Sequence, residues 1–402
     1  MQFKDIIGQQ AIKERLLRTV KNGRISHAQL FLGKGVNGKM ALAVAYAQYI
    51  NCPNRSETDS CGVCSSCVKY QAMSHPDLFF SFPVNKAGKN SSTVSGDKNG
   101  GIEKSDQVSK NAKASDLIST MFYRKWLEYL KNCQYYPDLQ SWYKKIEIGD
   151  KQGNINVNEA RRIVKDLSYK PVEAQYKVLI IWQPEKMNIQ SANLLLKFFE
   201  EPPARTLILM VSDEKDQLLT TIQSRFQIIP IPKISNQDME NHLQQKFPSH
   251  TPDQIASSVK ISNGDLQKAY SFIDAGDQMK DYFLLFQSWM RMCVKKGSLE
   301  EIKGFVEKAA RMGRENQKHF LKYSLRLFRE ALIVNYGHPS LSSLTTYEND
   351  FFMRFARFIH INNRQIIEKF DQAIIEIGRN ANASVLFMSL SLDLSQLLKI
   401  EQ

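Results

Sequence analysis

Residues 5–49 combine two helical patterns with one short apolar run. The first helical pattern leads to an apolar run at residues 29–32, a glycine-rich turn follows, and a second helical pattern begins near Lys39. Apolar residues at helical spacing indicate amphipathic helices, and a short apolar run beside turn residues indicates a buried strand. This order predicts the beginning of an α/β nucleotide-binding domain.

Two further apolar runs, at residues 177–182 (KVLIIW) and 206–212 (TLILMVS), are bounded by polar residues. Uninterrupted apolar runs of this length are typical of parallel strands that are buried on both faces. A helix predicted at residues 191–200 lies between them and is stopped by Pro202 and Pro203, because proline cannot continue a helix. These elements extend the predicted α/β domain.

Residues 84–155 interrupt this pattern as an insertion. Residues 85–115 have almost no large apolar side chain, so burial cannot offset their ordering entropy and they are predicted to be flexible. The remainder is rich in aromatic residues, which either form a small satellite core or stack on nucleic-acid bases or a partner protein. These aromatic residues are Trp126, Tyr129, Tyr135, Tyr136, Trp142 and Tyr143.

The run IPIPK, which contains Pro230 and Pro232, marks a domain boundary. Helical periodicity continues beyond it almost without interruption, and no strand is needed there. We therefore predict three parts: an α/β nucleotide-binding domain over residues 1–231, a small helical lid over 232–277, and an all-helical domain over 278–402.

The 402 residues carry a formal charge of +13 and a pI near 9.3. A chain of this length folds as two or three domains. The positive charge favours polyanionic surroundings such as DNA, although a surplus spread over a large surface also serves solubility. The chain begins without the apolar stretch of a signal peptide and has no run of about 18 apolar residues, so we expect a cytoplasmic protein with no membrane contact.

The turn after the first strand, GKGVNGKM, matches the phosphate-binding pattern G-x4-G-K but departs from it at the following position. Gly33, Gly35 and Gly38 let backbone N–H groups approach phosphate oxygens, and Lys39 is placed to pair with the outer phosphates. Met40 stands where a Ser or Thr hydroxyl normally holds Mg²⁺. A purely structural glycine-rich turn is the alternative interpretation.

The acids that such an ATPase needs are missing from the end of the KVLIIW run. One carboxylate should complete the metal shell there and another should activate water, but the chain has Trp182 and Gln183 instead. Glu185 is displaced from that position, and Glu200 and Glu201 lie further along. Because loss of a general base alone costs roughly 10²- to 10⁴-fold in rate, we expect no hydrolysis in cis and doubtful ATP binding.

One catalytic element is retained in the run TIQSRFQ, just before the boundary prolines. Ser224 and Arg225 lie there, at the edge of the predicted domain. An arginine that reaches the γ-phosphate in a neighbouring subunit contributes roughly 10³- to 10⁵-fold to hydrolysis. A chain without its own hydrolytic centre therefore has a reason to keep it. An ordinary surface or salt-bridge arginine is the alternative.

Four cysteines, Cys52, Cys61, Cys64 and Cys67, follow the spacing C-x8-C-x2-C-x2-C. Cytoplasmic thiols stay reduced, and two overlapping C-x2-C steps let thiolates converge on one tetrahedral ion. Four thiolates fill the coordination sphere, so the expected Zn²⁺ is structural and not catalytic. Metal-free or disulfide-linked cysteines are the alternative.

In combination, these motifs resemble the delta-prime branch of the bacterial DNA polymerase III clamp-loader family, within the AAA+ superfamily. The resemblance rests on FKDIIGQ, SHAQLFLGKGVNGK, the four-cysteine segment, SHPDLFF, VNEARRIVKDLSYKP, SANLLLKFFEEPP and TTIQSRFQ, which cover most of the first domain. NGDLQKA and GRNANASVLFMSLSLDL resemble the same family more weakly. The fold implied is an α/β P-loop AAA+ domain with a small helical lid and an all-helical C-terminal collar domain.

The resemblance also implies roles for particular residues. Arg225 takes the place of the trans-acting arginine of a Ser-Arg-Cys motif, in which Phe226 replaces the usual Cys. Ser212 takes the place of the first sensor residue, and Gln267 stands where active relatives have the lid arginine that senses nucleotide. The long insertion departs from the most compact members of the family.

Members of this family form a five-subunit ring that loads the sliding clamp onto primed DNA. The resemblance implies a non-hydrolysing subunit of the replisome that supplies Arg225 to a gamma or tau ATPase, faces the delta subunit, and reaches clamp and primer-template DNA through the complex. A catalytically active gamma-type ATPase is one alternative, and ATP turnover by the isolated chain would favour it. A zinc-containing DNA-binding module on an ATPase-like scaffold is another, and salt-sensitive DNA binding lost on zinc removal would favour that.

Overall fold

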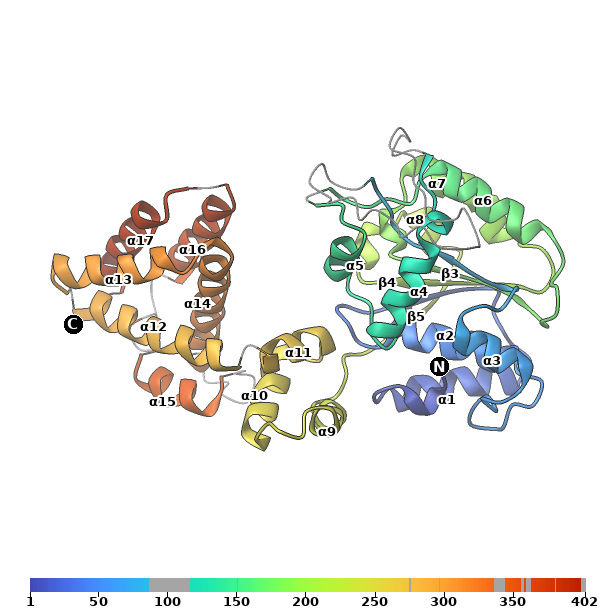
Figure 1. The fold of residues 1–402 in the computed structure, drawn as a ribbon, viewed down its shortest axis with the longest axis horizontal. Helices are drawn as coiled ribbons and strands as arrows, with labels where there is room; N and C mark the ends of the chain where they lie inside the picture. The colour runs from blue at the N-terminus through green and yellow to red at the C-terminus, as the bar shows by residue number, and fades with distance from the viewer. Residues whose placement is uncertain are drawn as a thin grey trace, which may run out of the picture. The chain divides into compact units, whose positions relative to one another are not determined.

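The described part of the chain forms two compact units in this computed structural model (Figure 1). The first is Met1–His242 with Gly264–Gln267, and the second is Leu243–Asn263 with Lys268–Gln402. The structure describes residues 1–86, 116–149, 151–274, 276–295, 297–335, 344–355, 358, 363–379 and 381–398. Almost all of the segment predicted to be flexible, residues 85–115, lies outside these ranges, and the boundaries predicted after residues 231 and 277 stay predictions.

Five parallel strands form the sheet of the first unit, in the order β2-β3-β4-β1-β5. The strands are β1 (Ala28–Leu32), β2 (Leu78–Ser81), β3 (Lys177–Trp182), β4 (Thr206–Ser212) and β5 (Gln227–Pro230). β1, β3 and β4 are the strands predicted from apolar runs. β2 and β5 were not predicted because each is only four residues long, and β5 is an edge strand with exposed positions that tolerates a terminal proline.

Helices cover both faces of this sheet, as Figure 1 shows. On one face, alternate strand side chains pack against α6 (Val157–Ser168), α7 (Ile189–Glu200) and α8 (Thr220–Gln223) in a core that includes Leu30, Ile181, Met210 and Phe199. On the other face lies α2 (Lys39–Ile50), in which every residue is buried. Four of its residues are alanines, which let the helix lie close to the sheet. The α/β part of the predicted fold is confirmed.

The remaining helices of the first unit are short. They are η1 (Phe3–Asp5), α1 (Gln10–Lys21), α3 (Ser65–Ala72), η3 (Ser119–Phe122), α4 (Tyr123–Asn132), α5 (Leu139–Lys145), η4 (Pro184–Lys186) and η5 (Lys215–Gln217). α9 (Asn236–Lys246) runs from the first unit into the second.

The described part of the insertion has an aromatic core of its own. The rings of Phe82 and Trp126 are stacked with their centroids 4.4 Å apart, and Trp142 meets Trp126 edge-on at 5.1 Å. Both tryptophan side chains are fully buried. The satellite-core interpretation is therefore confirmed for these residues, which cannot stack on bases from where they lie.

The second unit is helical throughout its described residues. Its helices are α10 (Pro252–Ser262), α11 (Leu266–Asp274, which begins in the first unit), α12 (Gly276–Lys295), α13 (Leu299–Arg311), α14 (Arg314–Asn335), α15 (Thr346–Phe355), α16 (Asn363–Gly378) and α17 (Ala383–Leu397). Aromatic residues fill its core around Trp289, whose Nε1 donates a hydrogen bond to Ser391 Oγ at 2.9 Å. The predicted all-helical C-terminal region is confirmed. No described helix combines the length and apolarity that a membrane span requires.

Asp77 fixes the loop that precedes β3 to the start of β2. Its fully buried carboxylate accepts hydrogen bonds from the backbone N–H groups of Val172 at 2.7 Å, and of Glu173 and Ala174 at 2.9 Å each. Three N–H donors compensate the desolvation of the buried carboxylate. The two strands are thus tied together before their ladder begins.

Substituting Asp77→Ala should lower the free energy of unfolding by at least about 3 kcal/mol, because three backbone N–H donors lose their charged acceptor. Chemical denaturation followed by circular dichroism measures the change. Asp216→Ala, at an exposed aspartate, is the control and should change stability by less than about 0.5 kcal/mol. Equal effects of the two substitutions would contradict this account of Asp77.

Candidate functional site

The glycine-rich turn lies between β1 and α2, as predicted for a phosphate-binding loop. Gly35 and Gly38 have φ angles of 72° and 92°, which favour glycine. A Cβ atom at Gly35 would lie 2.5 Å from Asp265 Oδ2, so no other residue fits without a shift. Asn37 Nδ2 donates to Ile231 O at 3.0 Å and closes the turn against the chain that follows β5. Gly33, Gly35, Gly38 and Lys39 are thus assembled in one loop.

The ammonium group of Lys39 is held by groups of the same chain. Its Nζ lies 2.6 Å from Asp213 Oδ1 and donates a hydrogen bond to Gly35 O at 2.5 Å. Only 7% of the Lys39 side chain is exposed. An incoming phosphate would have to compete with Asp213 for this lysine, because both are anions.

Asp213 was not identified from the sequence. β1 and β4 are neighbours, with Leu32 opposite Ser212, so the residue after β4 arrives beside the phosphate-binding loop. Its second oxygen, Oδ2, accepts a hydrogen bond from Gln183 Nε2 at 3.0 Å. The available signal was a carboxylate directly after a buried strand, at the carboxyl edge where parallel sheets place their sites.

From its position in the sequence, Glu185 was expected to be displaced from the strand end. The structure instead places it at the same end of the sheet as Asp213. Its carboxylate turns back onto the end of β4, where Oε2 accepts from Ser212 Oγ at 3.0 Å and Oε1 from Asp213 N at 3.2 Å. Burial raises the pKa of Glu185 in spite of these hydrogen bonds. The sensor-position serine is thereby engaged with a carboxyl group. Gln267, at the lid position, is half-buried at the start of α11 and brings no charge to this edge.

Two of the positions that a hydrolytic centre needs, 40 and 182, are apolar here. Met40 is buried in α2, and Trp182, at the end of β3, is 1% exposed. The Trp182 ring lies 5.0 Å, centroid to centroid, from the ring of Trp126 in the insertion. An aromatic contact therefore lies at the end of β3, where the sequence analysis expected a hydrolytic centre to need an acid.

The four predicted cysteines converge on one point. All four Sγ atoms lie within 4.8 Å of one another, and the pairs Cys52–Cys61, Cys52–Cys64 and Cys61–Cys67 are 3.6, 3.9 and 3.9 Å apart. Four thiolates at about 2.3 Å from a tetrahedral ion lie about 3.8 Å from one another. The donor set fits a structural metal ion with four sulfur ligands.

Backbone N–H groups point at the sulfur atoms, as they do in cysteine metal sites. Cys64 N donates to Cys61 Sγ at 3.3 Å, and Cys67 N donates to Cys64 Sγ at 3.4 Å. Donation from Val63 and Cys64 lowers the pKa of the Cys61 thiol to about 6, whereas burial raises that of Cys52. An N–H donor stabilises the thiolate, which is the form that binds metal.

The cysteine segment also anchors the beginning of the chain. The Asp59 carboxylate accepts from Phe3 N at 3.1 Å and from Lys4 N at 3.0 Å, and Gln2 Nε2 donates to Ser60 O at 2.5 Å. Phe3 is buried beneath this contact. Loosening the cysteine segment should therefore loosen the N-terminal residues as well.

Arg225 lies at the amino end of the parallel strands, whereas the phosphate-binding loop lies at their carboxyl end. It lies two residues before β5, whose first residue pairs near the start of β1, whereas the loop follows the end of β1. At about 3.3 Å per residue, these two edges are roughly 16 Å apart. The structure thus does not bring Arg225 to the loop of its own chain.

The guanidinium group of Arg225 is held by neighbouring groups. Its Nε donates to Glu200 Oε1 at 2.7 Å, and its Nη2 forms an ion pair with the same carboxylate. Its Nη1 donates to Thr221 O at 2.6 Å. The side chain is 26% exposed, so a group that approaches from solvent can reach it once the ion pair with Glu200 breaks.

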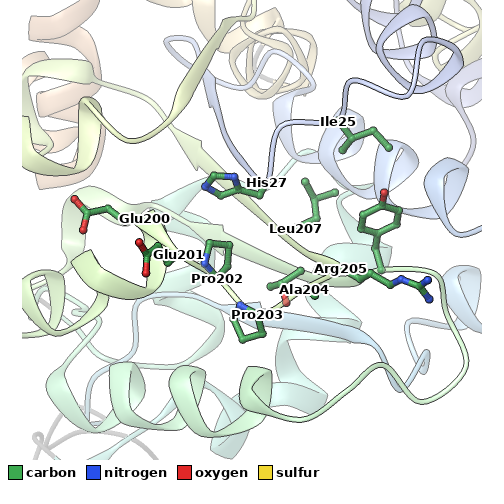
Figure 2. A pocket seen from close by; sticks show the side chains of 11 residues that line it. Ile25, His27, Glu200, Glu201, Pro202, Pro203, Ala204, Arg205 and Leu207 are labelled. Carbon is green, nitrogen blue, oxygen red and sulfur yellow. The ribbon is translucent and has the colours of Figure 1, made fainter.

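Glu200 also borders a hollow of about 340 Å³ at this edge of the sheet. Figure 2 shows the carboxylates of Glu200 and Glu201 at one end of the hollow and the guanidinium of Arg205 at the other. His27 lies on its wall, with Nε2 3.1 Å from Phe199 O. The Arg225–Glu200 pair therefore lies beside an open, charged depression of the surface.

The chain is similar to several known proteins. The profile of the family described as DNA polymerase III, delta subunit, matches residues 8–235. The chain is 23% identical over 277 residues to DNA polymerase III subunit tau of Salmonella typhimurium, covering 68% of this chain and 32% of that protein. It is 23% identical over 266 residues to DNA polymerase III subunit delta' of Bacillus subtilis, covering 64% of this chain and 60% of that protein.

A solved structure was also matched, that of a DNA polymerase III gamma subunit-related protein from Thermotoga maritima. It has a TM-score of 0.35 and 12% identity, with 95% of this chain and 99% of that chain covered. The chain spans about a third of the length of the tau relative and three fifths of the length of the delta' relative.

The cysteine cluster should hold one metal ion per chain, and Cys64→Ser should remove it. We expect the substitution, or treatment with a strong chelator, to cost at least about 2 kcal/mol. That loss would lower the melting temperature by roughly 4–8 °C. Elemental analysis and differential scanning calorimetry measure the two quantities. Cys133→Ser, outside the cluster, is the control and should keep its metal; unchanged metal content in Cys64→Ser would rule the site out.

Proposed function

Because the chain belongs to the DNA polymerase III, delta subunit family, we propose that it is a delta-prime-type, non-hydrolysing clamp-loader subunit. It supplies Arg225 in trans to ATP bound by a neighbouring gamma- or tau-type subunit while the sliding clamp is loaded onto primed DNA. The observation that carries this proposal is the placement of Arg225 at the sheet edge opposite the chain's own phosphate-binding loop.

The absence of hydrolysis in cis is supported by how the site's groups are used. Lys39 is paired with Asp213, and Trp182 packs against the insertion where an acid would be needed. Met40 has no oxygen for Mg²⁺. Each departure removes a different requirement of phosphoryl transfer, so one compensating change elsewhere would not restore it.

The trans role of Arg225 is supported by its partners and exposure. Ser224 and Arg225 directly follow the short helix α8, and Glu200 holds the guanidinium beside a hollow that is open to solvent. A planar guanidinium suits the bidentate binding of a phosphate as well as it suits the carboxylate that it contacts here. Glu200 thus keeps the guanidinium group of Arg225 ordered until a phosphate replaces the carboxylate as its partner.

The partners follow from the family. Relatives named as tau and delta' subunits belong to one polymerase assembly, so this chain acts with gamma- or tau-type and delta subunits. Clamp and primer-template DNA are reached through that complex in the cytoplasm, and the charge of +13 favours a position near DNA.

The ion of the cysteine cluster is Zn²⁺ in this proposal, because four thiolates in tetrahedral spacing select it. With all four positions filled by protein, the ion has no open site for substrate and stabilises the fold.

A gamma-type ATPase is the second candidate, favoured by equal identity, 23%, to a tau and to a delta' relative. Lys39 and the glycines of its loop are also intact. ATP turnover by the isolated chain that disappears in Lys39→Ala would replace the first proposal with this one.

Arg225→Ala should reduce the DNA-stimulated ATPase rate of a reconstituted loader by about 10³-fold at each site that it serves, because it removes the charge that stabilises the transition state. Steady-state phosphate release measures the rate, and size-exclusion chromatography checks that the ring assembles. Arg205→Ala, at the same edge of the sheet, is the matched control and should stay close to wild type. An unchanged rate for an assembled Arg225→Ala ring would exclude the trans role.

Glu200→Gln should raise the ATPase rate of the ring measured without DNA by up to about fivefold. The substitution weakens a partly exposed ion pair worth up to about 1 kcal/mol and so releases Arg225 more readily. Glu201→Gln is the matched control, since the carboxylate bonds of Arg225 go to Glu200. A lower rate in Glu200→Gln than in Glu201→Gln would mean that Glu200 is needed to position Arg225.

A further inference from the structure

The insertion is attached firmly to the α/β domain at both of its described ends. Ser119 N and Ser119 Oγ donate to the buried carboxylate of Glu159 in α6 at 2.9 and 2.6 Å. Trp142 Nε1 donates to Pro83 O at 2.9 Å, and Val84 forms an antiparallel bridge with Asn154. Residues 116–149 are thus a packed part of the domain.

The insertion packs against Trp182, which stands where an acid was expected. Trp182, at the end of β3, contacts Trp126 of α4, and Trp126 in turn packs against Phe82 and Trp142. A carboxylate at position 182 would be desolvated by these rings. Trp182, which offers no metal ligand, therefore also fixes α4 beside the end of β3.

The turn after α4, residues 135–137, reaches the phosphate-binding loop. Its backbone is ordered by the end of the helix: Tyr135 N donates to Leu130 O at 2.8 Å and Tyr136 N to Cys133 O at 2.9 Å. Tyr135 adopts a φ angle of 65°, which a non-glycine residue adopts only when its surroundings hold it there. The backbone thus directs this turn toward the loop.

Tyr136 lies directly on the loop. Its ring atom Cε1 is 3.3 Å from the position that a Cβ would occupy at Gly38, and its hydroxyl accepts a hydrogen bond from Ile7 N at 2.9 Å. Only 5% of its surface is exposed. The ring and the hydroxyl therefore fasten the turn to the loop and to the chain's N-terminal segment at once.

The space left between the turn and the loop is about 10 Å³, room for about one water molecule. Nucleotide-sized ligands occupy pockets of roughly 300–1,000 Å³. The walls are formed by the loop at Gly38 and Lys39, by the turn at Tyr135 and Tyr136, and by the strand ends at Trp182 and Val211. A nucleotide cannot enter while residues 135–137 are in place.

We propose that residues 135–137 of the insertion are the resident occupant of the phosphate-binding loop and exclude nucleotide from it. The subunit then keeps one conformation at this site whatever the nucleotide concentration, while its neighbours bind and release ATP. This inference deepens the proposed function and rests on it, but it does not depend on Arg225. It assigns the insertion a task that its sequence left open.

The test uses the zinc-loaded full chain and the fluorescent nucleotide mant-ADP. Wild type should show no saturable binding up to about 1 mM, whereas Tyr135→Ala/Tyr136→Ala should bind at least tenfold more tightly than that limit. Adding Lys39→Ala to the double variant should abolish the new binding. Tyr136→Phe keeps the ring over the loop and is the matched control, which should stay closed.

Hydrogen exchange of the peptide covering residues 33–40 provides a second readout. Exchange should be at least about tenfold faster in the double variant than in wild type, because the loop amides lose their cover. Circular dichroism and zinc content show whether the variants are folded, and Tyr136→Ala alone replaces the double variant if the latter is unstable.

Any of three results would overturn the inference. They are saturable mant-ADP binding by wild type, equal exchange in wild type and the folded alanine variant, and a folded variant that exchanges faster but still binds no mant-ADP. All three are measured on the isolated chain. Failure here is therefore distinguishable from failure of the Arg225 test, which requires the assembled ring.

Discussion

The parallel pairing of β1 with β4 and β5 is the constraint on which the rest of the first unit depends. Because all three strands run in one direction, the residues after β1 and β4 arrive at the same end of the sheet, and the residues that lead into β5 arrive at the other end. Lys39 and Asp213 meet for this reason, and Arg225 is kept away from both. The proposed trans role of Arg225 requires this separation, which the backbone hydrogen bonds of the parallel sheet provide.

The departures at the phosphate-binding edge support one another. Asp213 neutralises the lysine that would otherwise face the loop without a phosphate, and Gln183 satisfies the second oxygen of Asp213. Trp182 removes a carboxylate and supplies packing for the insertion. Acids placed at positions 182 and 183 would bury charge beside aromatic rings, which costs several kcal/mol per ion. The observed arrangement of Lys39, Asp213, Gln183 and Trp182 is thus stable in its own right.

Much of the fold follows from local pattern, because buried parallel strands and amphipathic helices leave continuous and periodic apolar signals. β3 and β4 match their predicted ranges, whereas β2 and β5 are too short and too mixed to stand out. The cysteine cluster was predictable because its ligands lie close together in sequence. The Lys39–Asp213 pair and the position of Tyr136 were not, because each joins residues distant in sequence through the sheet order.

The insertion shows why composition and spacing stop short of function at such a site. Its aromatic residues predicted a satellite core, and the structure contains that core. The contact with the phosphate-binding loop, however, comes from a single turn, residues 135–137, which follows the helix that the core holds in place. A ligand-binding loop without its ligand leaves backbone N–H groups and a lysine without partners, at a cost in free energy. Asp213 supplies the lysine with a partner and residues 135–137 cover the loop, so the chain offsets part of that cost without ATP. The proposed exclusion of nucleotide and the packing of the insertion against the loop thus depend on the same contacts.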